Sequence, residues 1–206
     1  MLTKLTAVAV TLLVVLATLS YVRGGGPQPV YTTAGGIVGL VADEDGLLWL
    51  EKPKPDSSGG ALFALAKGTG APSCLHPDPR LTEIAAAGDR VFGIELEGDR
   101  GAVVAIPRAG GGITRLAENL TRPAGLAVAP WGRAHAGTVY WTETAPAPLK
   151  HVYHVPVLEA RTTLRALAAG GGEPHSLAAC EGGPAGFQGE LVGVHAGRLY
   201  WLDRFG

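Results

Sequence analysis

The stretch Val139-Tyr140-Trp141-Thr142-Glu143 is one of four copies of a five-residue pattern in this chain. Each copy has an apolar residue, an aromatic or apolar residue, Trp or Gly, a small or apolar residue, and then a carboxylate. The other copies are Leu47–Glu51, Val91–Glu95 and Leu199–Asp203. The third positions are residues 49, 93, 141 and 201, so the steps between them are 44, 48 and 60 residues. The chain therefore repeats a unit of roughly 40–50 residues, with one longer step.

The composition of the 206-residue chain favours short strands joined by tight turns. Hydrophobic residues make up 47% and charged residues 17%, with 31 Gly and 15 Pro. Such a chain is too apolar to be disordered and too rich in turn formers for a helical bundle. Strand repeats of this length are typical of β-propeller blades. We therefore expect an all-β fold, an incomplete β-propeller of four-stranded antiparallel blades.

The repeat predicts the approximate limits of each blade and most of its strands. The blades are expected at about 37–78, 81–120, 123–180 and 184–206, the last of them truncated. The second unit is the most regular, with strands at 82–87, 90–97, 102–107 and 113–117 joined by glycine-containing turns. In the first unit a weak outer strand is expected around 73–75. In the third unit 151–156 is expected as the third strand, and 157–169 as an insertion forming an extra strand or a helical turn.

Three and a half units are fewer than the four to eight blades, roughly, of a closed propeller. An open ring leaves sheet faces and strand edges unpaired, which is a liability for an isolated domain. We interpret the chain as a fragment of a longer propeller, with self-association that completes the ring as the alternative.

Residues 1–23 are predicted to be a signal anchor or a signal peptide. The run 5–22 carries no charge, Lys4 precedes it and Arg23 follows it. This length is at the lower edge of what spans a bilayer, and no A-x-A cleavage site is present. Residues 24–36 then form a linker. We expect one hydrophobic N-terminal helix and a membrane-anchored, extracytoplasmic protein, with secretion after signal cleavage as the alternative.

Two motif copies and one strand end resemble a known family. Tyr140-Trp141-Thr142-Glu143, Tyr200-Trp201-Leu202-Asp203 and Ile106-Pro107 before a triple-glycine turn resemble the YWTD and TolB-like six-bladed propellers. The resemblance covers about residues 37–206, although Glu mostly replaces Asp and Gly93 once replaces the Trp. It implies a binding or scaffold module outside the cytoplasm. It also implies that one carboxylate per blade ties neighbouring blades together, namely Glu51, Glu95, Glu143 and Asp203.

The recurrence of the motif gives its residues a structural interpretation. Trp49, Trp141 and Trp201 are expected to pack between blades, and the four carboxylates are expected to stabilise each blade rather than act as acid–base pairs. Trp131 lies in a turn outside the repeat. It is the candidate recognition residue.

No catalytic, cofactor or metal site is predicted. A G-x-S-x-G nucleophile motif is absent, and Asp43-Glu44-Asp45-Gly46 lacks the spacing of an EF-hand and favours a hairpin turn. Lys and Arg total 17 against 18 Asp and Glu, without a basic run, which argues against nucleic acid as a partner. Cys74 and Cys180 match no zinc or redox spacing and are interpreted as unpaired thiols, with a disulfide between them as the alternative.

The hypothesis that fits these observations is a non-catalytic binding or scaffold module with a protein or carbohydrate partner. The alternative is a propeller hydrolase of the gluconolactonase type with a divalent cation. That alternative needs carboxylate and Asn ligands, and Asn119 is the single Asn in the sequence. A truncated product without independent function is the third interpretation.

Overall fold

The computed structural model describes residues 31–33, 35–54, 57, 59–129, 137–146, 150–152, 155–157, 160–181, 190–195 and 198–202. The chain divides into two compact units, Met1–Ala34 and Gly35–Gly206, and the description below concerns the second. The predicted leader 1–23 and residues 24–30 and 34 of the predicted 24–36 linker lie outside the described residues. Within the described ranges no helix is long and apolar enough to span a membrane.

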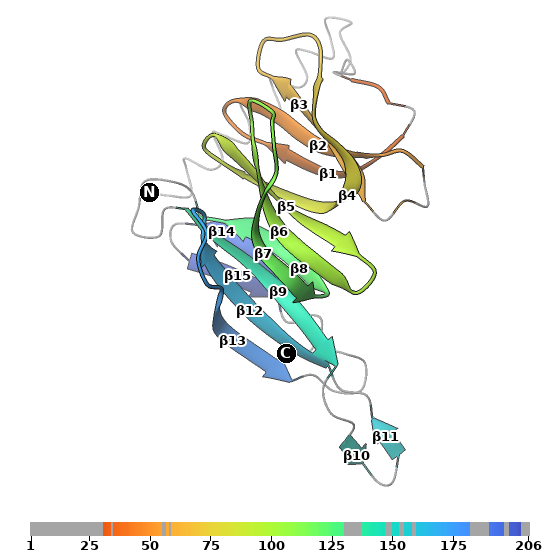
Figure 1. The fold of residues 1–206 in the computed structure, drawn as a ribbon, viewed down its shortest axis with the longest axis vertical. Helices are drawn as coiled ribbons and strands as arrows, with labels where there is room; N and C mark the ends of the chain where they lie inside the picture. The colour runs from red at the N-terminus through yellow and green to blue at the C-terminus, as the bar shows by residue number, and fades with distance from the viewer. Residues whose placement is uncertain are drawn as a thin grey trace, which may run out of the picture. The chain divides into compact units, whose positions relative to one another are not determined.

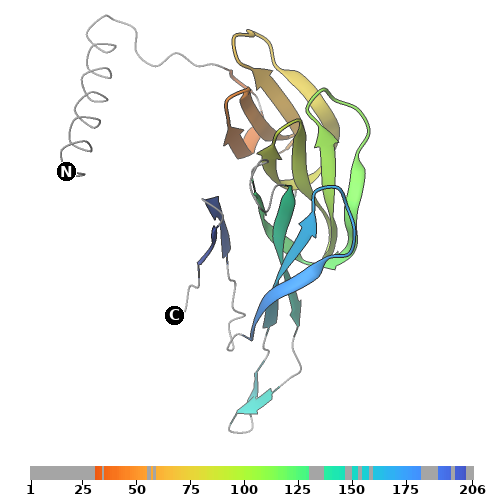
Figure 2. The same cartoon turned by 90° about the vertical axis from the view of Figure 1, so that its left-hand side faces the viewer.

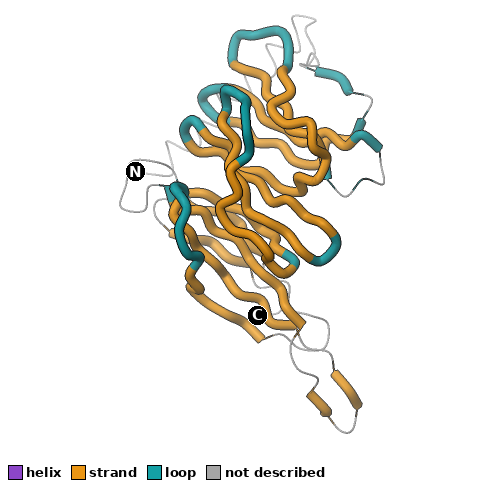
Figure 3. The backbone as a smooth tube through the Cα atoms, viewed as in Figure 1, coloured by secondary structure: helices purple, strands orange, loops and turns teal. Residues whose placement is uncertain are grey.

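The described part of the second unit is built from antiparallel strands and loops, which confirms the predicted all-β class (Figures 1 and 3). Seven strands form one sheet in sequence order: β1 (Gly36–Ala42), β2 (Gly46–Lys52), β3 (Gly60–Ala66), β4 (Ser73–Ala87), β5 (Arg90–Glu97), β6 (Arg100–Pro107) and β7 (Thr114–Thr121). A second sheet has the order β13-β12-β9-β8 and contains β8 (Pro123–Val128), β9 (Thr138–Pro146), β12 (Ala160–Ala168) and β13 (His175–Glu181). Two hairpins complete the set, β10 (Lys150–Val152) with β11 (Val155–Val157) and β14 (Glu190–His195) with β15 (Arg198–Leu202).

The long strand β4 divides the seven-stranded sheet into two four-stranded meanders. Its residues 73–76 pair with β3 and its residues 83–87 pair with β5, while Leu81 pairs with both Gly60 of β3 and Glu95 of β5. The sequence prediction of two separate strands was wrong here, because Pro77 and Pro79 hold the residues before them in an extended conformation. The strand therefore stays extended while it changes partners. We call β1 to β4 the first meander, β4 to β7 the second, β8, β9, β12 and β13 the third, and β14 with β15 the fourth.

The third meander takes its third strand from the segment predicted as an insertion. Strand β12 pairs with β9 from Ala160 opposite Pro146 to Ala168 opposite Thr138. Thr162, Leu164 and Ala166 are buried along one face of the strand, and Leu167 is buried on the opposite face. Leu164 and Leu167 belong to two different apolar clusters, so the strand is packed on both faces. The described residues of the segment predicted as the third strand, 151–152 and 155–156, instead belong to the pair β10–β11, which lies beyond the ends of β9 and β12 (Figure 2).

Each meander begins with a strand pair that contains a register shift. The shifts lie between Ile37 and Gly39, between Leu81 and Glu83, between Ala124 and Ala127, and between Leu191 and Gly193. A β-bulge bends its strand and leaves backbone groups of the extra residues outside the ladder. The four copies of the sequence repeat therefore also share a register shift in their first strand pair.

Three apolar clusters join consecutive meanders. The first junction packs Leu48, Leu50 and Leu62 with Leu81, Val91, Val104 and Ile106. The second junction packs Phe92, Ile94 and Val103 with Val139, Trp141 and Leu167, and the third packs Tyr140 and Leu164 with Val194 and Leu199. In each junction, one cluster combines the first motif position of the later meander with the second motif position of the preceding meander. These pairs are Val91 with Leu48, Val139 with Phe92, and Leu199 with Tyr140. This repeated stacking of antiparallel meanders makes the fold β-propeller-like.

Candidate binding surface

The motif carboxylates of the second and third meanders both accept hydrogen bonds from an arginine. Glu95 at the end of β5 is buried, and its Oε2 accepts from Nη2 of Arg115 on β7 at 3.1 Å. Glu143 on β9 accepts from Nε of Arg165 on β12 at 2.8 Å. Its other oxygen accepts from the backbone N–H of Thr121 at 3.2 Å, and Thr121 belongs to the second meander. Glu51 lies half-buried near the end of β2, and Asp203 is outside the described residues.

The third motif position is filled differently from one meander to the next. Trp49 is buried and stacks on Phe63 with ring centroids 5.8 Å apart. Trp141 has 0% exposure in the second junction, between strands of two meanders. A Cβ placed on Gly93 would lie 2.7 Å from Cδ2 of Leu81, so this leucine occupies the space where the other copies carry an indole. Trp201 lies on β15, and its side chain is not described.

Glu83 is a joining residue that the sequence analysis missed. It lies on β4, and its two carboxylate oxygens accept from the N–H groups of Gly125 at 3.0 Å and Leu126 at 2.8 Å. These two N–H groups belong to the bulge of β8, where the register skips from Ala124 to Ala127. The bulge therefore exposes two donors that one carboxylate satisfies. Glu83 is not part of the recurring motif, and the signal that could have indicated its site is Gly125, which has a φ of 64° in the bulge.

The acidic turn 43–46 connects β1 and β2 of the first meander, and it also binds Arg108. Asp43 accepts from the N–H groups of Asp45 and Gly46 through Oδ1, and its Oδ2 binds Nη2 of Arg108 from the second meander. Asp45 lies 3.6 Å from Nη1 of the same arginine. Burial lowers the pKa of the Arg108 guanidinium from its ordinary value. The described residues contain no group of three or more His, Cys, Asp or Glu arranged to hold a metal ion.

The second meander carries two adjoining hollows, which we call together the arginine hollow. One has a volume of 160 Å³ and the other 330 Å³, and both are lined by Arg80, Glu95 and Arg115. The smaller hollow adds Glu97, Arg100, Glu118 and Asn119. The larger adds His76, Gly111, Gly112 and Ile113. Arginine side chains with planar, multiple donors suit the recognition of carboxylates and related anions.

The charges in the arginine hollow differ strongly in exposure. The side chain of Glu95 is 8% exposed, whereas those of Arg80 and Arg115 are 44% and 48% exposed. Two further carboxylates approach these guanidiniums from the surface: Glu97 lies 3.9 Å from Arg80, and Glu118 lies 3.7 Å from Arg115. Both distances exceed that of a hydrogen bond. Glu95 and Arg115 therefore form a hydrogen-bonded pair, and Glu97 and Glu118 approach the arginines at longer distances around it.

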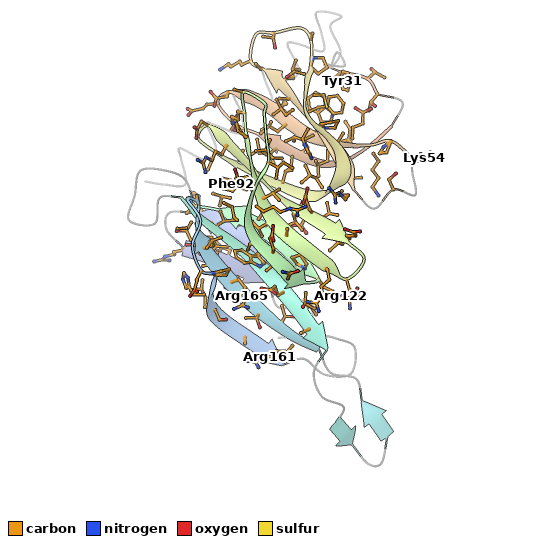
Figure 4. The ribbon with its side chains drawn as sticks, viewed as in Figure 1. Tyr31, Lys54, Phe92, Arg122, Arg161 and Arg165 are labelled. Atoms are coloured by element: carbon orange, nitrogen blue, oxygen red, sulfur yellow. The ribbon has the colours of Figure 1, made fainter. Side chains whose placement is uncertain are left out.

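The other residues singled out from the sequence lie elsewhere. Trp131, the predicted recognition residue, is outside the described residues. Cys74 is exposed and free, and the side chain of Cys180 is not described. Figure 4 labels Arg165 and Arg161, both on β12 of the third meander and apart from the strands that line the arginine hollow.

No protein-family model matches the chain, and no curated protein matches it. Among solved structures, it is similar to a chain of a nidogen/laminin complex with 18% identity and a TM-score of 0.49, over 75% of this chain and 52% of that one. It is also similar to a puromycin-hydrolysing peptidase of Mycobacterium tuberculosis, with 18% identity and a TM-score of 0.50, over 76% of this chain and 26% of the peptidase. The chain thus spans about half the length of the first structure and about a quarter of the second. At this identity the likeness concerns the fold alone.

Proposed function

We propose that this chain is a non-catalytic protein-binding module, built as an incomplete β-propeller in which each meander is a blade. The stacking of the meanders supports this architecture, because the same motif faces meet in all three junctions. The fourth meander, as described, contributes only β14 and β15 to the series.

The observation that carries the binding function is the division of the charged side chains into two groups. Glu83, Glu143 and Arg108 join neighbouring meanders and are used in packing. The arginine hollow instead presents half-exposed guanidiniums on one meander, over a buried carboxylate that fixes one of them. A preorganised charged surface of this kind is suited to recognising a partner and setting its orientation.

The binding function is testable by site-directed photocrosslinking in the native host. A benzophenone amino acid replaces Glu97, whose side chain is 86% exposed at the edge of the hollow. The matched control replaces Leu177 on β13, an exposed residue in the third meander. We expect a discrete protein adduct from position 97 alone, identified by mass spectrometry. The same adducts from both positions, or none from position 97, would contradict the proposal.

We also propose that the module is extracytoplasmic and tethered through residues 5–22. The support is the uncharged apolar run between Lys4 and Arg23 and the tether-like sequence that follows it. The test attaches a small epitope after Gly206 and treats intact cells or spheroplasts with protease. Loss of the epitope without cell lysis is expected, together with fractionation into membranes. Full protection of the epitope until lysis is the outcome that rejects this location.

A further inference from the structure

We infer that the fourth meander of one copy of this chain packs against the first meander of a second copy, so that copies associate head to tail. The two surfaces are the outer face of the first meander, with Ile37, Leu40 and Leu47, and the outer face of the fourth, with Tyr200. The inference goes beyond the proposed binding function, because it does not involve the arginine hollow and rests on the way in which the meanders stack.

The first junction shows how a meander face of this kind is covered by its neighbour. There the second meander packs Leu81, Ile84 and Val91 against the first meander. Leu81 stands opposite the motif carboxylate and Ile84 opposite the third motif position, whereas Val91 is itself the first motif position. Leu81 and Val91 have 0% exposure. The face that packs on a preceding meander is therefore defined by these three register positions.

The first meander has an apolar residue at each of the same three register positions. Ile37 stands opposite the motif carboxylate, Leu40 stands opposite the third motif position, and Leu47 is the first motif position. Ile37 and Leu40 are 49% and 62% exposed, and Leu47 is half-buried. Trp49 is already buried in this face and stacks on Phe63, so the open part is formed by β1 and the start of β2. The face therefore has the composition of a junction but is partly exposed to solvent.

The fourth meander presents the complementary motif position on its own outer face. In the first and second meanders the second motif positions, Leu48 and Phe92, are 2% and 0% exposed and pack against the following meander. Tyr200 holds the same position in the fourth meander and is 46% exposed. Its neighbour Leu199 packs against the third meander, and successive residues of a strand point to opposite faces. Tyr200 therefore points away from the third meander.

The fourth meander also repeats the position of a polar contact between meanders. Glu83 stands opposite the fourth motif position of its meander, Ile94, and accepts two hydrogen bonds from the bulge of the following meander. Glu190 stands opposite the same motif position, Leu202, in the fourth meander. Strand β1 of the first meander contains a bulge of its own. We expect Glu190 of one copy to accept from N–H groups of this bulge in the other copy, as Glu83 does within the chain.

A second copy is the occupant that these observations favour. Six large apolar side chains are exposed among the described residues, and four of them lie on β1 or β15, namely Ile37, Val38, Leu40 and Tyr200. Grouped apolar residues of this kind are typical of interaction surfaces. The first meander fits a meander that has an apolar second motif position and a carboxylate opposite its fourth, and the fourth meander has both. Because the two faces differ, the contact is heterologous, and its repetition closes a ring or extends a row of copies.

The test measures self-association of the full chain in a mild non-ionic detergent by sedimentation velocity at increasing protein concentration. We expect the average mass to rise with concentration. Leu40→Lys and Tyr200→Lys should each weaken association roughly 10-fold or more, because a charge is placed in an apolar contact. Leu177→Lys is the matched control, since Leu177 is 47% exposed on β13 of the third meander. It should change the association constant by less than about 2-fold.

A mixture of the two face variants distinguishes a head-to-tail contact from a contact between like faces. Leu40→Lys keeps the outer face of the fourth meander and Tyr200→Lys keeps that of the first, so the two variants should form a heterodimer although each alone stays monomeric. Leu40→Met guards against a folding artefact, since it keeps an apolar side chain and should retain most of the association.

Four results would overturn the inference. They are a monomeric unsubstituted chain, an equal loss of association in Leu177→Lys, a mixture of the face variants that does not associate, or association through residues 5–22 that neither face variant changes. The proposed binding function is judged separately. If the chain stays monomeric while the adduct at position 97 persists, the head-to-tail inference fails and the binding function stands. If copies associate as expected but position 97 gives no discrete adduct, the inference stands and the proposed function fails.

Discussion

The first and second junctions of this molecule are held together in different ways. The first and second meanders share strand β4, so a continuous hydrogen-bonded ladder already joins them. The second and third meanders belong to separate sheets, divided at Arg122, a non-glycine residue with φ of 44°. Where the ladder is interrupted, polar side chains bridge the gap: Glu83 binds two N–H groups of β8, Glu143 binds Thr121, and Arg90 donates to the carbonyl of Ala169.

The apolar packing of the two junctions differs at the third motif position. In the second junction this position is Trp141, which fills the space between strands of two meanders. In the first junction it is Gly93, and Leu81 from the neighbouring strand fills the same kind of space. Substitutions at these equivalent positions should therefore destabilise the protein in opposite ways. A smaller residue at Trp141 leaves a cavity, whereas a larger residue at Gly93 causes overpacking.

The largest effect is expected from Trp141→Ala. The indole is fully buried, and its removal leaves a cavity that strands of two sheets cannot close. Truncation of such an aromatic typically costs about 3–5 kcal/mol in the free energy of unfolding. Urea unfolding followed by circular dichroism measures the loss. Trp141→Phe, which keeps most of the apolar contact, should lose clearly less, and equal losses would show that the indole does not fill the junction.

Glu83→Ala is expected to show the next largest effect, because it leaves the N–H groups of Gly125 and Leu126 without their acceptor. Two charge-assisted hydrogen bonds at a half-buried position suggest a loss of roughly 2–4 kcal/mol in the free energy of unfolding. Hydrogen exchange of these two amides should also become faster. Glu44→Ala, in the exposed turn of the first meander, is the control. If both variants unfold at the same urea concentration, Glu83 does not join the meanders.

The sequence predicted the strand content well where repetition and turn chemistry agree. In the second meander the strands from Arg90 to Pro107 lie where the Gly-Asp turns place them. In the third meander the third strand was predicted at 151–156, a segment that contains a proline as 102–107 does, whereas the glycine run 170–172, which corresponds to 110–112, indicates the end of the third strand correctly. Strand β12 ends just before that run, as β6 ends before 110–112. A turn sets the pairing register of the two strands that it joins, whereas a single proline within a strand does not.

The candidate surface was much harder to predict than the fold. The motif drew attention to Glu95, whose arginine partner lies 20 residues further along the chain on another strand. Arg80 and Arg115 do not recur between units, and only the pairing of β4, β5, β6 and β7 brings them to one hollow. Glu83 depends on the bulge of β8, for which Gly125, with its φ of 64°, is the available signal in the sequence, but nothing in the sequence pairs that glycine with Glu83. Trp131 lies outside the described residues, so its role stays a prediction.

Gly93→Ala is expected to destabilise the first junction by about 1–3 kcal/mol through overpacking. The added Cβ would lie 2.7 Å from Cδ2 of Leu81, which is fully buried and has little room to move. A double-mutant cycle with Leu81→Ala sharpens the test, because the smaller side chain relieves the clash. The double variant should lose less free energy of unfolding than the sum of the single losses. An additive result would mean that Leu81 and position 93 do not share one space.

The smallest effect is expected from Arg108→Met, which removes a polar contact between the first and second meanders. The guanidinium binds Asp43 and lies near Asp45 at the rim of the junction. Methionine keeps much of the apolar contact of the side chain, and Asp43 retains its hydrogen bonds from the N–H groups of Asp45 and Gly46. The expected loss is about 1 kcal/mol in the free energy of unfolding, decreasing as salt is raised to about 0.5 M, because Asp45 is 63% exposed and Asp43 keeps 29% of its side chain in contact with solvent. By contrast, the loss in Glu83→Ala should persist at the same salt concentration, since its carboxylate accepts two short hydrogen bonds from backbone N–H groups rather than pairing with a mobile charged side chain. A different result would be that Arg108→Met loses as much free energy of unfolding as Glu83→Ala and that salt does not change this loss. The first junction would then depend on polar contacts as strongly as the second does.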